Sequence, residues 1–243
     1  MVEAGLWGLL GASSLLIGAF GGLGLRVRRR WVALLMAFGA GGLISALAFD
    51  LTEEAFARGG TGTVAVGLAL GALTFFGGDQ LLARRGARRH GPGTASAADG
   101  NGPAIVLGAL LDGIPESVVL GSTLLAGTGV GVPFLAAVFI SNVPESWSAA
   151  VDLRREGHGA RWIIGLWVVV ALVSGLAAGL GYGLLGEMGG SVLVPFIQAF
   201  AAGAILTMLA DTMIPEAFEE GGNLSGLATV LGFAAAFFLN RAS

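Results

Sequence analysis

The sequence predicts an all-α polytopic membrane protein, and three observations carry this prediction. Apolar residues make up 55% of the 243 residues, charged residues make up only 12%, and the mean hydropathy is +0.83. A soluble chain carries roughly 25% charged residues, so this chain has too few to cover the surface of a soluble domain. The 43 glycines are scattered through the apolar runs, and glycine is frequent in transmembrane helices because it lets neighbouring backbones approach closely.

Crossing the hydrocarbon core takes a run of about 20 apolar residues. Eight runs of this kind are predicted to be helices, at 4–25, 31–50, 62–83, 103–126, 131–151, 161–185, 193–215 and 223–240. The first has an acidic rather than a basic head, so we expect it to be a span and not a cleaved signal peptide. Residues 84–102 are rich in Gly, Pro, Ser and Ala, which predicts a flexible loop.

The arginines orient the predicted spans. All thirteen basic residues are Arg, and eleven of them fall in the connections after the first, third and fifth runs. By the positive-inside rule that side is cytoplasmic, so both termini are expected outside an inner or plasma membrane. The chain has no Cys, which excludes thiolate sites and disulfides. A net charge of −3 gives no reason to expect a nucleic-acid partner.

An internal repeat relates the two ends of the chain. Residues 37–76 align without a gap to 199–238, with fourteen of forty positions identical, including EAFxxGG in both copies. The second and seventh runs cross in opposite directions, so the repeat is inverted. A shorter pair, DGIPES at 112–117 and SNVPES at 141–146, relates the fourth and fifth runs. The predicted arrangement is therefore 3 + 2 + 3, and inverted repeats of this kind are typical of secondary transporters.

The two central runs each have a proline near the middle. Pro115 and Pro144 each remove a backbone N–H and leave the carbonyl four residues earlier without its helical partner. Each proline is followed directly by a glutamate, Glu116 and Glu145. Broken helices with polar residues near the midplane are the places where transporters bind their substrates.

Three carboxylates, an amide and a hydroxyl are expected to converge between these two helices. Asp112 and Glu116 are i and i+4, and both Ser141 and Asn142 are within one turn of Glu145, so each set shares a helix face. A charged carboxylate at the bilayer centre costs about 2.5–3.5 kcal/mol on insertion scales. No Arg lies in the interior of a run, since Arg161 is the first residue of the sixth, so a cation or protons must neutralise these charges. Oxygen ligands suit hard or borderline divalent metals.

These motifs resemble the ZIP family of zinc and iron transporters. The resemblance rests first on two consecutive helices that have PES where that family has PEG. It is supported by the eight spans, the outside termini, the loop after the third span and the sequence MIPEAFEEGG at the end of the seventh. It implies a homodimer, an elevator-like motion, and a divalent ion (Zn²⁺, Mn²⁺ or Fe²⁺) as substrate, with no organic cofactor. Carried over by position, the metal ligands are Asp112, Glu116, Ser141, Asn142 and Glu145.

Several positions depart from the family pattern. Asp112 stands where the family has His, Gly113 where it has Asn, and Ala178 where many members have the glutamate of a second metal site. We therefore expect one ion rather than two, with Mn²⁺ or Fe²⁺ favoured because no imidazole remains. The same departures favour an alternative, a ZIP-derived protein that no longer transports metal and acts as a sensor or carries another substrate. A second alternative is an intramembrane enzyme using Asp79 with Asp112. Hydrolysis has little support, because the motifs contain no nucleophile–base pair, so we expect a non-enzyme.

Further acidic residues lie at the ends of the predicted spans. Asp211, Glu216 and Glu219 at the inner end of the seventh run are candidates for a release path, with a solvated helix end as the alternative. Asp50, close to two glutamates at the outer end of the second run, is a candidate for the entrance, with simple interfacial solvation as the alternative.

Overall fold

The computed structural model of the protein describes residues 1–84, 102–126, 130–187 and 192–242, and its elements in these ranges are all helical. The predicted loop at 84–102 therefore lies almost entirely outside the described residues. In chain order the elements are α1 (Val2–Gly24), α2 (Arg29–Ala46), the π-helix η1 (Leu47–Thr52), α3 (Glu53–Arg84), α4 (Gly102–Thr123), the 3₁₀-helix η2 (Leu124–Ala126), α5 (Val132–Arg155), α6 (Ala160–Glu187), α7 (Leu193–Met208), the π-helix η3 (Leu209–Met213), α8 (Ile214–Gly221) and α9 (Leu224–Ala242).

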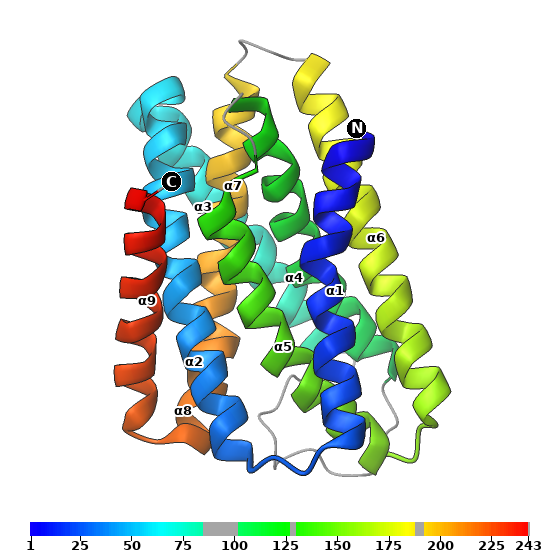
Figure 1. Cartoon of the computed structure of the whole chain (residues 1–243). Helices are drawn as coiled ribbons and strands as arrows, with labels where there is room; N and C mark the ends of the chain where they lie inside the picture. The colour runs from blue at the N-terminus through cyan, green and yellow to red at the C-terminus, as the bar shows by residue number, and fades with distance from the viewer. Residues whose placement is uncertain (85–101, 127–129, 188–191, 243) are drawn as a thin grey trace.

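Six stretches of the described residues are long and apolar enough to cross a membrane. This finding confirms the all-helical, membrane-spanning class that the composition predicts. The stretches are Val2–Gly24, Arg29–Leu81, Val132–Arg155, Ala160–Glu187, Leu193–Gly221 and Leu224–Ala242. Figure 1 shows the helices side by side, with both chain termini at the same end of the molecule.

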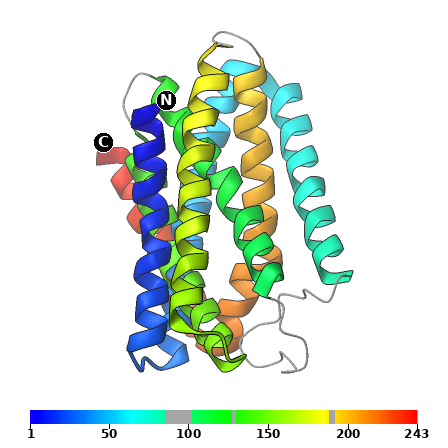
Figure 2. The ribbon, with the colours of Figure 1, turned by 90° about the vertical axis from the view of Figure 1, so that its right-hand side faces the viewer.

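The helices pack in two groups. The first group contains α1, which contacts α5 and α6, and α4, which also packs against α6. The second group contains two pairs of parallel helices, α2 with α9 and α3 with α7. Figure 2 shows α1 beside α6 and α3 beside α7. The groups meet mainly where α2 contacts α5, so α5 lies at the boundary between them.

Glycines allow the paired helices to approach backbone to backbone. A β-carbon on Gly41 of α2 would overlap the carbonyl oxygen of Thr229 on α9. At the repeat-equivalent position, a β-carbon on Gly203 of α7 would overlap the carbonyl oxygen of Leu68 on α3. Only glycine fits at such crossings, as in small-residue packing between membrane helices.

The internal repeat recurs in the local structure. The π-helices η1 and η3 begin at Leu47 and Leu209, and the left-handed glycines Gly60 (φ 70°) and Gly222 (φ 64°) follow each of them. Both pairs are 162 positions apart, the same offset as the sequence repeat. Figure 1 shows α2 and α7 running in opposite directions. Equivalent sequence therefore forms equivalent irregular helix in both copies.

Short helices occupy two segments that the sequence places largely between spans. Glu53 to Gly59 is helical before Gly60 interrupts α3, and α8 covers Ile214–Gly221. Both segments contain the helix-forming EAF sequence, and α8 has proline in its first turn, where a missing N–H costs nothing. A glycine in a left-handed conformation then ends each short helix.

Candidate metal site

The helices α4 and α5 continue through their internal prolines, Pro115 and Pro144. Their polar residues lie around a small cavity that we call the inner cavity, which also borders α1 and α6. Its volume is about 10 Å³, roughly the space that one water-sized sphere occupies. The polar side chains lining it are Asp112, Glu116, Ser117, Asn142, Glu145 and Ser174. The inner cavity therefore has room for a single small occupant.

The acidic side chains of the inner cavity are removed from solvent. Asp112 and Glu116 are each 4% exposed, Asn142 is 7% exposed and Glu145 is half-buried. Glu116 lies within electrostatic range of both Glu145 and Asp112, and none of the described residues that line the cavity is basic. Like charges in an apolar surrounding need a cation or protons to compensate them.

The carboxylates share a cavity but do not form a closed ligand shell. In the part of the chain that the structure describes, no group of three or more His, Cys, Asp or Glu side chains is close enough to hold a metal ion. The ligand assignment made from the motifs therefore stays a prediction.

Ser141 lies outside the lining of the inner cavity. Its hydroxyl donates a hydrogen bond to the carbonyl oxygen of Val138, at 2.9 Å, within its own helix. A β-carbon on Gly39 of α2 would lie 2.7 Å from the α-carbon of Ser141, so this part of α5 packs tightly on α2. The structure thus groups Asp112, Glu116, Asn142 and Glu145, and separates Ser141 from them.

Sequence reasoning missed Ser174 of α6, which is 2% exposed and lines the inner cavity. Its signal is the single serine of the apolar run 161–185, four residues before Ala178. Ala178 itself is fully buried, and a β-carbon on Gly8 of α1 would lie 2.5 Å from its β-carbon. Ala178 is not part of the cavity lining, and this packing leaves no space for a longer side chain there.

A second, larger cavity lies at the opposite end of the molecule from the termini, between α1, α2, α5 and α8. We call it the outer cavity because it lies at an end of the bundle, here the Arg-rich end, and not because of a side of the membrane. Its volume is about 300 Å³. Its charged lining residues are Arg26, Arg29, Asp152, Arg155, Glu216 and Glu220. Of the release-path candidates, Glu216 lines this cavity, whereas Glu219 and Asp211 are exposed and line neither cavity.

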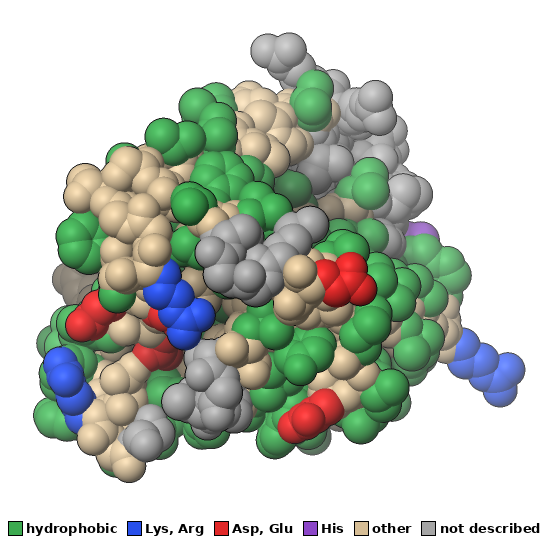
Figure 3. Space-filling view, turned by 90° about the horizontal axis from the view of Figure 1, so that it is seen from above, with side chains coloured by type: hydrophobic (Ala, Val, Ile, Leu, Met, Phe, Trp, Pro, Cys, Tyr) green, Lys and Arg blue, Asp and Glu red, His purple; other side chains and the backbone are tan. Residues whose placement is uncertain are grey.

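Asp50 lies in η1, at the end of the molecule that carries the termini. It is half-buried, and one of its carboxylate oxygens accepts a hydrogen bond from the side chain of Asn240. Figure 3 views this end and shows a few acidic and basic side chains scattered over a largely apolar or uncharged surface. Asp50 therefore lies at the opposite end of the molecule from the outer cavity. Its role at the entrance stays a prediction.

No family model matches the chain. A search of known proteins finds similarity to "Putative zinc transporter At3g08650" of Arabidopsis thaliana, at 27% identity over 194 residues. The match covers 74% of this chain and 29% of the relative, so this chain spans less than a third of that protein's length. Similarity to a protein named as a zinc transporter supports the resemblance to the ZIP family that the motifs of α4 and α5 indicate.

Proposed function

We propose that this protein is a divalent metal cation transporter, moving Zn²⁺, Mn²⁺ or Fe²⁺ across a membrane by alternating access. The observation that carries the proposal is the inner cavity. Three carboxylates, Asp112, Glu116 and Glu145, and the amide of Asn142 line a space for one small occupant. Carboxylate and amide oxygens are ligands that hard and borderline divalent ions take, and such an ion carries the charge opposite to that of the carboxylates.

An eight-pass arrangement is part of the proposal. The stretch Arg29–Leu81 has 53 residues, which as one helix would extend about 80 Å, more than twice the roughly 30 Å hydrocarbon core. The left-handed Gly60 interrupts it, so two crossings fit better than one. The 22 residues of α4 supply one further crossing beyond the six apolar stretches. Dividing Arg29–Leu81 into two crossings and adding α4 turns the six stretches into eight passes, which form the inverted 3 + 2 + 3 pattern.

The packing suggests which helices move. The group α1, α4, α5 and α6 surrounds the inner cavity, while α2 and α7 each pair with a helix of the other repeat. In our proposal the first group carries the ion past the second in an elevator-like motion. The Arg-rich connections face the cytoplasm of an inner or plasma membrane, both termini lie outside, and the protein acts as a homodimer without enzymatic activity.

Uptake of Mn²⁺ and of Zn²⁺ into vesicles containing the purified chain tests the proposal. The test variant is Glu116→Gln, which removes a buried charge of the inner cavity and keeps the side-chain shape. The matched control is Glu3→Gln, because Glu3 is exposed and lies outside the candidate site and pathway. We expect uptake by the native protein and the control, and at least a tenfold loss in the test variant. No uptake of either ion by the native protein would contradict transport.

One observation favours a second candidate, a metal sensor that binds without transporting. Asp112 and Ala178 stand where the resemblance to the ZIP family leads us to expect a histidine and the glutamate of a second metal site. A sensor would bind Mn²⁺ or Zn²⁺ in calorimetry and show no uptake, and Glu116→Gln would then reduce binding alone.

A further inference from the structure

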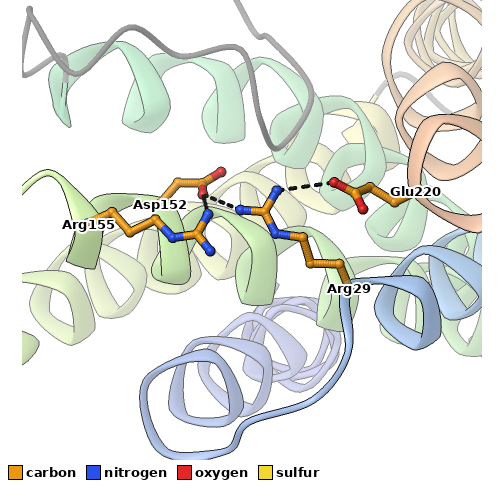
Figure 4. Close-up of polar contacts among 4 residues, drawn as sticks. All are labelled: Arg29, Asp152, Arg155 and Glu220. Carbon is orange, nitrogen blue, oxygen red and sulfur yellow. Dashed lines mark hydrogen bonds and ion pairs between the residues drawn. The ribbon is translucent and has the colours of Figure 1, made fainter.

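A short ion-pair network lies in the outer cavity (Figure 4). One guanidinium nitrogen of Arg29 is 3.1 Å from a carboxylate oxygen of Glu220, and its other terminal nitrogen is 3.7 Å from Asp152. Arg155 also pairs with Asp152, at 3.1 Å. All these groups line the same cavity of about 300 Å³, so they lie in a space large enough for other occupants.

Arg29 joins the two groups of helices. It is the first residue of α2, and Glu220 lies in α8, whereas Asp152 lies in α5, which carries Asn142 and Glu145 of the inner cavity. Arg155, by contrast, pairs with Asp152 three residues away on the same helix. Separating α5 from α2 and α8 therefore requires the Arg29–Asp152 pair to break, and leaves the Arg155 pair intact.

Along α5, the network lies between the inner cavity and the Arg-rich end. Glu145 and Asp152 are seven residues apart on α5, which is two helical turns or about 10 Å, and so they share a face. Glu145 lines the inner cavity and Asp152 lines the outer cavity, together with Glu216 and Glu220. An ion that leaves along this face next meets Asp152 and Glu220, the two carboxylates that pair with Arg29.

We propose that Arg29 is an internal cation that holds the outer cavity closed and is exchanged for the metal ion as that ion leaves. This inference rests on the proposed transport function and assigns a role to a residue outside the binding site. A divalent ion among Asp152, Glu216 and Glu220 competes for the carboxylates and repels the guanidinium, so α5 separates from α8. After release, Arg29 pairs again with Asp152 and Glu220.

The exposure of the network suits a reversible contact. The side chains of Arg29, Asp152 and Glu220 are 32%, 31% and 27% exposed. Ion pairs that are this accessible to water are weak, so they can break and re-form in every cycle. A fully buried pair would be costly to separate and would lock the two groups of helices together.

A single introduced thiol reports the opening. The chain has no Cys, and Ser148 lines the outer cavity, so Ser148→Cys gives one site for a charged maleimide. Labelling is measured on the purified whole chain in detergent, with and without Mn²⁺, which binds thiols less well than Zn²⁺ does. On this background Arg29→Gln is the test variant. Arg155→Gln is the matched control. Arg155 has the same charge and lines the same cavity, but it pairs with a residue of its own helix.

Without metal we expect Arg29→Gln to be labelled about two- to fivefold faster than the background, the factor that exposed pairs imply. We expect Mn²⁺ to speed labelling of the background and of Arg155→Gln, and to leave Arg29→Gln unchanged. Asp152→Asn, which breaks the pair between α2 and α5 and keeps Arg29, should behave like Arg29→Gln. This second variant keeps the test valid if Arg29→Gln does not elute as a folded protein.

Two results would overturn the inference. If Arg29→Gln and Asp152→Asn are labelled no faster than Arg155→Gln, the network does not hold the cavity closed. If they are labelled faster but Mn²⁺ changes labelling in none of the proteins, the ion does not exchange with Arg29. Uptake into vesicles then distinguishes a wrong role for Arg29, in which uptake persists, from a failure of the transport proposal, in which uptake is absent.

Discussion

Adding one methyl group at Gly232 should destabilise the protein, because α2 and α9 cross there backbone to backbone. A β-carbon at this position would overlap the carbonyl oxygen of Phe38 and lie 2.7 Å from its carbonyl carbon. Ordinary contact begins at 3.4 Å, so the two helices must separate by at least about 0.7 Å, the kind of backbone shift that overpacking forces. Neither obstructing atom belongs to a flexible side chain, so little local rearrangement is available.

Overpacking of this kind costs about 1–3 kcal/mol. For a chain of this size each kcal/mol lowers the melting temperature by roughly 2–4 °C, so we expect a loss of about 5 °C for Gly232→Ala. The matched control is Gly226→Ala on the same helix, where a β-carbon meets nothing within 4 Å. The control should be neutral or slightly stabilising, because Ala is about 0.5–1 kcal/mol better than Gly inside a helix.

The assay is the apparent melting temperature of the purified proteins, measured by loss of the monodisperse peak after heating. The repeat supplies an independent check. A β-carbon on Gly71 of α3 would overlap the carbonyl oxygen of Phe200 on α7, and Phe200 is the repeat equivalent of Phe38. Gly71→Ala should therefore show a similar loss. Equal melting temperatures for Gly232→Ala and Gly226→Ala would refute the argument from close helix contact.

Two further predictions concern the inner cavity. Replacing Asp112 with His should shift preference from Mn²⁺ toward Zn²⁺, because imidazole suits zinc better than harder ions; an unchanged rank order in competition binding would show that Asp112 is not a ligand. Metal binding should release protons, because carboxylate ligands must be ionised to bind, so affinity should fall as the pH is lowered. Calorimetry in buffers of different ionisation enthalpy measures this release, which Glu145→Gln should reduce; no proton release by the native protein would rule out a site of shared carboxylates.

Composition was enough to predict the helical membrane class, because too few charged residues are present to cover a soluble surface. The short helices beside η1 and η3 were harder to predict. Their EAF segments carry glutamates, which break the apolar pattern used to define spans, and π-helices have no sequence signature of their own. The repeat was the stronger guide there, since Gly60 and Gly222 share both their position in the repeat and a left-handed backbone.

The spacing on α4 and α5 indicated which polar residues share a face, and four of the five predicted ligands line the inner cavity. Spacing along one helix does not fix which neighbour a residue faces. Ser141 is one turn from Glu145, yet it packs toward Gly39 of α2. Ser174 was missed for the same reason, because only the packing of α6 brings it to the cavity. The pairing of Arg29 with Asp152 and Glu220 joins residues far apart in sequence and also required the fold.

The most direct test of a single metal site in the inner cavity is the number and position of the metal ions that the whole protein binds. A structure of the purified chain with Mn²⁺, read from anomalous scattering, should show one ion per chain in the inner cavity, in contact with Asp112, Glu116 and Glu145. Two ions about 3.5–4 Å apart, the spacing of two-metal sites, or a single ion that touches none of these carboxylates, would contradict it.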